Sequence, residues 1–289
     1  QAGEKKNPWS VRDVHLAHFA VSEVTAQRFW YHDRASREGP GLAGARQGVM
    51  DVWNLNWRAK MEGKKITLSA RHKGLELSLE LEPAKPIVFH GDRGLSRKGP
   101  GRGQASYYYS FTDLRAKGSL RTPSLERPVS VTGVGWFDQE FGSNQLGADQ
   151  VGWDWFSIHL SDGRDLMIYQ LRKKDGSIEP ASSGTLIEPS GRSTHLSLTD
   201  FRLSVASRWK SAKSGGTYPV RWRLEVPKAG FDLSLAVLVT DQELATEGST
   251  GVTYYEGVVG GQGISSGRQV TAEGYVEMTG YAGSLGGVF

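Results

Sequence analysis

Apolar and polar residues alternate along much of this chain, so that every second side chain is apolar. The alternation is clearest in residues 52–58, 75–81 and 220–226. A period of two indicates a β-strand with one buried and one solvated face. Tight hairpin turns are expected at four glycines between such segments: Gly63, Gly74, Gly163 and Gly176. No segment keeps helical spacing beyond about three turns, so the sequence predicts an antiparallel, all-β fold.

The order of these segments repeats within the chain. The matched pairs are residues 52–83 with 198–239, 107–110 with 253–256, and 131–138 with 270–277. Two copies of one β unit are the simplest explanation of a repeat in the same order. We therefore predict two domains, residues 1–148 and 149–289, with the boundary in the polar stretch 142–152.

The two units differ at their starts. The second opens with an alternating hairpin, residues 153–160 and 166–172, whose turn contains Asp162 and Gly163. The first has no equivalent before Val14, so its opening hairpin is lacking. Because a closed barrel leaves no free edge, either the first barrel is open or the chain is a trimmed form of a longer product.

The composition agrees with a turn-rich β protein that buries a core. Of 289 residues, 38% are hydrophobic and 23% are charged, and there are 37 glycines.

The net charge of +4 is spread along the chain, whereas a nucleic-acid surface needs a concentrated basic stripe, so we expect no nucleic-acid partner. The absence of cysteine excludes disulfides and thiol catalysis. No apolar run approaches the ~20 residues of a membrane span, and no signal peptide precedes Gln1, so we expect no stable membrane insertion.

The strand around Trp136 carries the most informative polar side chains. Because residues two apart on a strand share a face, Trp136, Asp138 and Glu140 point the same way. Two carboxylates about 6–7 Å apart beside an indole can divide the roles of general acid and base. Burial would raise the pKa of one and keep it protonated. The alternative is that this face is solvated and that Phe137 and Phe141, on the other face, lie in the core.

Aromatic rows supply candidate ligand-binding residues. Trp153 and Trp155 share a face and would make a wall for a flat or elongated apolar ligand. Tyr107 and Tyr109 form another row, whose hydroxyls could orient a polar end of a ligand. His18 is the best candidate for a buried polar histidine. Ordinary core packing is the alternative for the aromatic residues, and a hydrogen-bonded core position is the alternative for the histidine.

Sequence motifs for metals, cofactors and triad hydrolysis are absent. No two histidines have the spacing of a local zinc site, so we predict no metal. The chain has no phosphate loop, no Rossmann pattern and no Gly-x-Ser-x-Gly elbow. We therefore expect no cofactor and find no sequence support for a serine hydrolase.

With these residues in view, the chain resembles the AttH and carotenoid 1,2-hydratase family, also known as hydroxyneurosporene synthases, many of whose members are labelled predicted secreted hydrolases. The similar segments run in order along nearly the whole chain: residues 15–20, 90–92, 106–110, 135–143, 152–157, 169–172, 183–186, 218–222 and 274–281. The resemblance implies two tandem lipocalin-like barrels, hydration of an isoprenoid double bond in some relatives, and a periplasmic or secreted location. It matches Asp138 to the acid that protonates the alkene and Trp136 to its aromatic neighbour. The hydratases also have a histidine and a tryptophan upstream, and the corresponding region near residues 107–111 has no histidine here.

Three functions follow as hypotheses, and whether the protein is an enzyme stays open among them. In the first, an apolar isoprenoid or lipid-like molecule is hydrated, with Asp138 as acid and Glu140 activating water. In the second, the protein carries such a molecule without chemistry. The third, a secreted hydrolase, rests on the family label. The expected partner is an apolar small molecule, and no pattern in the sequence assigns an oligomeric state.

Overall fold

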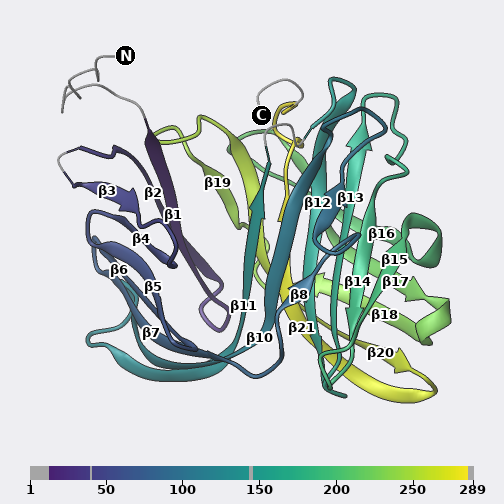
Figure 1. The fold of residues 1–289 in the computed structure, drawn as a ribbon, viewed down its shortest axis with the longest axis horizontal. Coiled ribbons are helices and arrows are strands. Elements are labelled where there is room, and N and C mark those ends of the chain that lie inside the picture. Colours follow the sequence, from purple (N-terminus) through teal and green to yellow (C-terminus); the bar gives the residue numbers. More distant parts are fainter. Residues whose placement is uncertain (1–12, 40, 143–145, 286–289) are drawn as a thin grey trace.

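The computed structural model describes residues 13–39, 41–142 and 146–285. Nearly all regular structure within these ranges is strand, and the two helices there are single 3-10 turns, η1 (Leu198–Asp200) and η2 (Pro227–Ala229). The strands form three antiparallel sheets, and the two large ones are curled (Figure 1). The predicted all-β, lipocalin-like fold class is confirmed. Neither described helix is long and apolar enough to cross a membrane.

The first part of the chain forms a hairpin and a nine-stranded sheet. The hairpin pairs β1 (Val14–Glu23) with β2 (Arg28–Arg37), and among the described strands neither pairs with another. The nine-stranded sheet has the order β11-β10-β7-β6-β5-β4-β3, and both β8 and β9 also pair with β10. Its strands are β3 (Ala43–Ala45), β4 (Asp51–Asn54), β5 (Trp57–Glu62), β6 (Lys65–His72), β7 (Leu75–Pro83), β8 (Val88–Phe89), β9 (Leu95–Arg97), β10 (Ala105–Arg121) and β11 (Val129–Phe141).

The second part of the chain forms a ten-stranded sheet. Its order is β15-β14-β13-β12-β21-β20-β18-β17-β16, and β19 pairs with β20. The strands are β12 (Gln150–Leu160), β13 (Asp165–Lys173), β14 (Ser183–Ile187), β15 (Ser193–Ser197), β16 (Arg202–Lys210), β17 (Thr217–Val226), β18 (Phe231–Val237), β19 (Glu243–Ala245), β20 (Thr253–Ser265) and β21 (Arg268–Met278).

Two of the three alternating segments lie within single strands, and the third does not. Residues 75–81 lie in β7 and residues 220–226 lie in β17, as predicted. Residues 52–58 were expected to form one strand, and this was wrong because the chain turns between β4 and β5. Leu55 has a φ of 56°, the left-handed conformation of a tight turn. Asn54 and Asn56 of this turn continue the alternation of polar and apolar residues. The sequence pattern therefore gave no sign that the chain reverses direction there.

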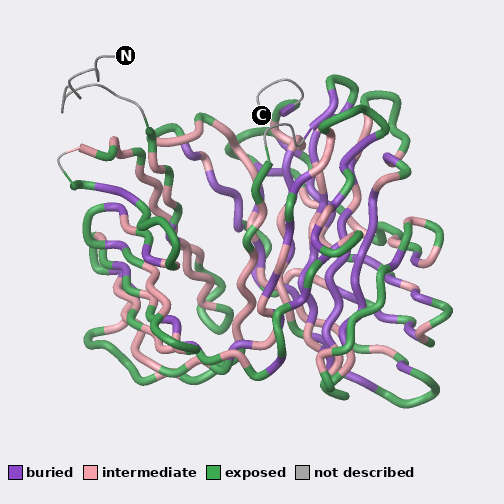
Figure 2. Tube along the Cα trace, in the orientation of Figure 1, coloured by how far each residue is buried: buried purple, intermediate pink, exposed green. Residues whose placement is uncertain are grey.

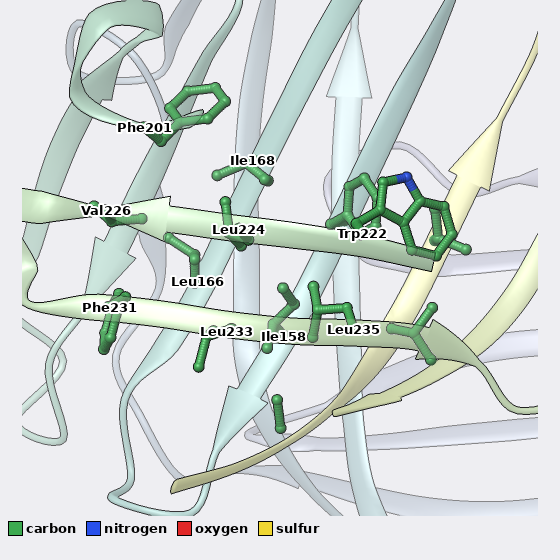
Figure 3. Packing of buried hydrophobic residues seen from close by; sticks show 14 of the residues in the cluster. Ile158, Leu166, Ile168, Phe201, Trp222, Leu224, Val226, Phe231, Leu233 and Leu235 are labelled. Carbon is green, nitrogen blue, oxygen red and sulfur yellow. The ribbon is translucent and has the colours of Figure 1, made fainter. Parts of the chain in front are cut away.

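The largest core lies inside the ten-stranded sheet (Figure 2). Alternate residues of β17 point into it, and Figure 3 shows Trp222, Leu224 and Val226 in a row. Trp222 is 2% exposed and meets Phe156 of β12 edge to face at 5.2 Å. Aromatic pairs favour this geometry and add to the apolar area that each ring buries.

The opposite face of the ten-stranded sheet packs against the nine-stranded sheet. Met167 and Leu171 of β13 point away from the large core and form a separate cluster with Tyr108 of β10. Figure 1 shows β10 and β11 between the rest of their own sheet and strands β12 and β13. The two large sheets therefore meet through side chains of β10, β11, β12 and β13.

Two predictions about the chain's organisation are not tested by these strands. The opening hairpin said to be lacking before Val14 would fall on residues 1–12, which lie outside the described residues. The nine-stranded sheet ends at Phe141 and the ten-stranded sheet begins at Gln150. The division into domains 1–148 and 149–289 stays a prediction.

Candidate active site

A cavity of about 310 Å³ lies where the two large sheets meet. Strands β10 and β11 form one wall, and β12, β13 and β21 form the other. The lining combines carboxyl groups, one ammonium group, aromatic rings and two leucines: Asp138, Glu140, Glu277, Lys98, Tyr108, Trp153, Trp155, Tyr169, Leu146 and Leu171. Such a site can hold an apolar molecule against acidic groups.

Strand pairing explains which side chains of β10 and β11 face the cavity. The alternation of β11 places Asp138 and Glu140 on one face. Antiparallel register then sets Ser110 of β10 opposite Asp138 and Tyr108 opposite Glu140. Residues paired in this way have side chains on the same face, so Tyr108 belongs to the cavity wall.

Asp138 is half-buried and receives several hydrogen bonds. The Ser110 hydroxyl donates to its Oδ1, and the indole Nε1 of Trp136 donates to the same oxygen at 2.8 Å. Burial raises the pKa of Asp138 to about 6, and the negative charge of Glu140 adds to the rise. The hydrogen bonds from Ser110, Trp136 and Tyr108 oppose it by favouring the carboxylate. A carboxyl group with this pKa can exchange a proton near neutral pH.

Glu140 is held in an ion pair inside the same wall. Its Oε1 lies 2.6 Å from Nζ of Lys98 and accepts a hydrogen bond from Ser106. The Lys98 side chain is 8% exposed, and its ammonium lies 4.2 Å from the ring centroid of Tyr169. A buried ammonium needs such partners, so Lys98 and Glu140 fix each other in place.

The opposite wall contributes a second acidic group, Glu277 of β21. The indole Nε1 of Trp153 donates to its Oε1 at 3.0 Å, and Glu256 of β20 lies directly opposite in the register. Burial, together with the charges of Asp138 and Glu140, raises the pKa of Glu277 to about 7, and the hydrogen bond from Trp153 opposes the rise. Burial and the charge of Glu277 also raise the pKa of Glu256. Glu277 is therefore partly ionised at neutral pH, where it can give up or take up a proton.

Aromatic side chains connect the two walls. The indole Nε1 of Trp155 donates to the Tyr108 hydroxyl at 2.9 Å. The rings of Trp136 and Trp155 meet edge to face, with centroids 6.3 Å apart. These contacts fix the rings beside the carboxyl groups, where their π faces can stabilise positive charge.

Five of the residues selected from the sequence come together here. Asp138, Glu140, Trp153 and Trp155 line the cavity, and Trp136 supports Asp138 from beside it.

The selected tyrosines lie elsewhere, on the other face of β10. Tyr107 is 57% exposed and stacks on Phe141 with ring centroids 5.6 Å apart. Tyr109 packs near Phe89 and Phe137. Neither tyrosine lines the cavity, whereas Tyr108 between them does.

The expectation that His18 is buried was wrong, because its side chain is exposed in β1. His18 lies outside the cavity and joins β1 to the ten-stranded sheet. Its Nδ1 is 2.5 Å from the Tyr254 hydroxyl, and its Nε2 is 2.9 Å from Ser249 Oγ. It also lines a separate, mainly apolar groove of about 400 Å³ beside Trp53 and Trp57.

Sequence reasoning missed Lys98, Tyr108 and Glu277. The alternation already grouped Tyr108 with Ser110, but it did not tell which face of β10 would be covered. Glu277 was noted only as the repeat counterpart of Asp138. No group of three or more histidines, aspartates or glutamates in the described part of the chain could hold a metal ion.

Known proteins resemble this chain over most of its length. A family model described as AttH-like matches residues 1–281. The crystal structure of a protein assigned as AttH from Nitrosomonas europaea is 31% identical, with a TM-score of 0.84, and the match covers 94% of this chain and 83% of that one. Kievitone hydratase from Nectria haematococca is 18% identical, with a TM-score of 0.73 over 93% of this chain and 80% of its own, and this likeness concerns the fold alone. No curated protein matches the sequence significantly.

Proposed function

The chain belongs to the AttH-like family, and on that premise we propose that it hydrates a double bond of an apolar, isoprenoid or lipid-like molecule in the cavity between its two large sheets. The observation that carries the proposal is Asp138, a half-buried carboxyl group with a pKa of about 6 on the cavity wall. General acids work best when their pKa lies near the working pH.

The reaction needs one proton donor and one proton acceptor. Protonated Asp138 gives its proton to one alkene carbon, and the π electron pair forms the new C–H bond, leaving a cation on the other carbon. A water oxygen then bonds to that carbon, and its surplus proton passes to a carboxylate. A proton returned to Asp138 through solvent closes the cycle, so that one water is added without oxidation or reduction.

The cavity suits the positive charge that forms between these steps. Glu140 and Glu277 contribute negative charge, and the rings of Trp155 and Tyr108 line the same space. Anionic groups and π faces stabilise a cation most strongly where water is excluded. Lys98 opposes this field, but its ion pair with Glu140 reduces the effect.

Two carboxylates can accept the proton from water. Glu140 is the first candidate, because it shares a face with Asp138 and lines the cavity. Glu277 is the second, because with a pKa of about 7 its carboxylate can take up a proton near neutral pH. Replacing each by glutamine separates them, since only the acceptor's loss lowers kcat by the 10²–10⁴-fold that is typical of proton transfer.

A specific observation also favours non-catalytic carriage of an apolar molecule. The groove beside β1 is lined mainly by apolar side chains, including Trp53, Trp57, Leu68 and Leu77. It contains none of the carboxyl groups of the cavity. A ligand recovered unaltered from this groove would support a carrier.

The hydrolase hypothesis has less support from the geometry. Ser110 Oγ lies 2.7 Å from His90 Nε2, which is the distance of a serine–histidine pair. Ser110 is 0% exposed, however, and its hydroxyl proton is donated to Asp138. A nucleophile must reach the substrate and give its proton to the histidine, and Ser110 does neither.

Hydration is tested by incubating the protein with unsaturated isoprenoids, carotenoids and fatty acids in H₂¹⁸O. We expect a product that has gained one labelled water, and Asp138→Asn should slow its formation by about 10²–10⁴-fold. The matched control is Asp241→Asn, which changes an aspartate that pairs with Lys213 at the surface. Unchanged turnover by Asp138→Asn would refute the role of Asp138. Native mass spectrometry that finds a bound but unaltered lipid would instead support the carrier.

A further inference from the structure

A buried chain of hydrogen bonds leads from the ten-stranded sheet to Asp138. Thr185 Oγ1 of β14 lies 2.8 Å from His90 Nδ1, and His90 Nε2 lies 2.7 Å from Ser110 Oγ. The Ser110 hydroxyl then donates to Asp138 Oδ1. Thr185, His90 and Ser110 are 2%, 1% and 0% exposed, so water does not compete for these bonds.

The chemistry of these groups fixes the direction of the chain. A serine hydroxyl has one proton, and Ser110 donates it to Asp138, so Ser110 Oγ accepts from His90 Nε2–H. A neutral imidazole that donates through Nε2 accepts through Nδ1, and the Thr185 hydroxyl is the donor there. Burial, with the charges of Lys98 and His195, lowers the pKa of His90 to about 3 and keeps the ring neutral.

We propose that Thr185, His90 and Ser110 are positioning residues through which the ten-stranded sheet orients Asp138 and sets its acidity. The role of these residues in catalysis rests on the proposed hydratase function, whereas the hydrogen bonds themselves do not depend on it. Since Oδ1 of Asp138 already receives bonds from Ser110 and Trp136, the transferable proton is placed on Oδ2. Each bond to Oδ1 favours the carboxylate, which makes the protonated form a stronger acid.

The turn after His90 holds the ring in position. The backbone N–H of His90 donates to the Tyr108 carbonyl at 3.0 Å, and its ring packs on the Tyr108 ring with centroids 4.2 Å apart. Gly91 has a φ of +66°, and a Cβ there would lie 2.3 Å from the Leu95 carbonyl oxygen. The chain can therefore turn back to β9 only because residue 91 is glycine.

The other charged groups near Asp138 stay in place when a substitution removes one of the hydrogen bonds from Thr185 or Ser110. Glu140 lies on the same strand, Tyr108 lies on β10, and Glu277 faces it from β21. Lys98 is the cation beside Glu140 and near His90. None of these side chains is changed by substituting Thr185 or Ser110. A shift in the pKa of Asp138 in these variants therefore measures the effect of the lost hydrogen bond.

The first experiment titrates the carboxyl carbons of ¹³C-labelled aspartate by NMR, with Asp138 assigned from Asp138→Asn. We expect Ser110→Ala to raise the pKa of Asp138 by about one unit, which is a tenfold weaker acid. Thr185→Val should raise it by a smaller amount, because it removes a more distant donor. The control Thr122→Val removes another buried hydroxyl, which follows β10 and bonds Glu23 and Ser124 instead.

The second measurement uses the unaltered protein and so does not depend on variant folding. The ¹⁵N shifts of His90 should show a neutral ring protonated on Nε2 and unprotonated on Nδ1. A ring protonated on Nδ1, or an Asp138 pKa that is the same in Ser110→Ala and Thr185→Val as in the control, would overturn the inference. If the pKa of Asp138 shifts in the variants but the protein hydrates no substrate, the positioning role of Thr185, His90 and Ser110 is supported and the proposed hydratase function is not.

Discussion

A carboxyl group can protonate an alkene only while it carries its own proton. Burial raises the pKa of Asp138 to about 6, so about half of the carboxyl groups carry the proton at pH 6, about nine-tenths do one pH unit lower, and the protonated fraction falls above pH 6. We expect kcat/KM to fall about tenfold per pH unit well above pH 6, and if Glu277 is the acceptor, its pKa of about 7 adds a fall on the acid side. The measurement is a pH–rate profile of kcat/KM. A rate that does not fall on the alkaline side, up to pH 9, would mean that the protonated form of Asp138 is not needed and would contradict the assignment.

The same residue shows how far sequence reasoning reaches within one strand. A period of two correctly grouped Trp136, Asp138 and Glu140, because alternate side chains of a strand must share a face. Applied to β10, it grouped Tyr107 with Tyr109 but could not tell that Tyr108 would face the partner sheet. Which face is covered depends on the packing of whole sheets, and three consecutive tyrosines provide no contrast in polarity.

At the scale of elements, the turn between β8 and β9 makes a prediction about stability. In Gly91→Ala, the new Cβ must adopt a φ of +66° and also displace the Leu95 carbonyl 2.3 Å away. Strain of this kind costs ~1–3 kcal/mol, and urea unfolding measures it. The control Gly63→Ala has a similar φ of +61° but meets no atom within 4 Å, so it should be destabilised less. Equal losses in the two variants would mean that the close approach to Leu95 has no energetic effect.

Turn chemistry also explains which elements were predictable. The hairpin of β12 and β13 was expected from its alternation and from Asp162 and Gly163, and Gly163 has a φ of +85° in the turn. The reversal at Leu55 was not expected, because it contains no glycine and its flanking asparagines keep the period of two. A left-handed residue other than glycine is uncommon, so the local pattern favoured one continuous strand.

At the scale of the whole molecule, the cavity exists because two sheets dock. Asp138 and Glu277 are far apart in sequence and lie on opposite walls. The repeat in the sequence related them as counterparts, but a repeat describes similarity and not contact. Their approach is set by buried bonds between the sheets, such as those of Lys85, and no local pattern of hydrophobic residues records such bonds.

The last prediction concerns that docking. Lys85, which follows β7, places Nζ 2.6 Å from Asp165 Oδ2 of β13 and 2.7 Å from the Gly163 carbonyl oxygen. Thr112 of β10 donates to the same carboxyl oxygen at 2.8 Å, and His159 Nδ1 lies 3.0 Å from Oδ1. The side chains of Lys85 and Asp165 are 6% and 3% exposed. The pair therefore joins the two large sheets where water is excluded.

Removing one partner from a buried ion pair leaves the other charge uncompensated, so Lys85→Met should lower the free energy of unfolding by ~3–5 kcal/mol. Lys60→Met is the control, because Lys60 pairs with an exposed Glu62 and such pairs contribute ~0–1 kcal/mol. Adding Asp165→Asn to Lys85→Met should recover part of the loss, since it removes the unpaired charge. If Lys85→Met costs no more than Lys60→Met in urea unfolding, the docking of the sheets depends on the apolar contacts around Tyr108 and not on this pair.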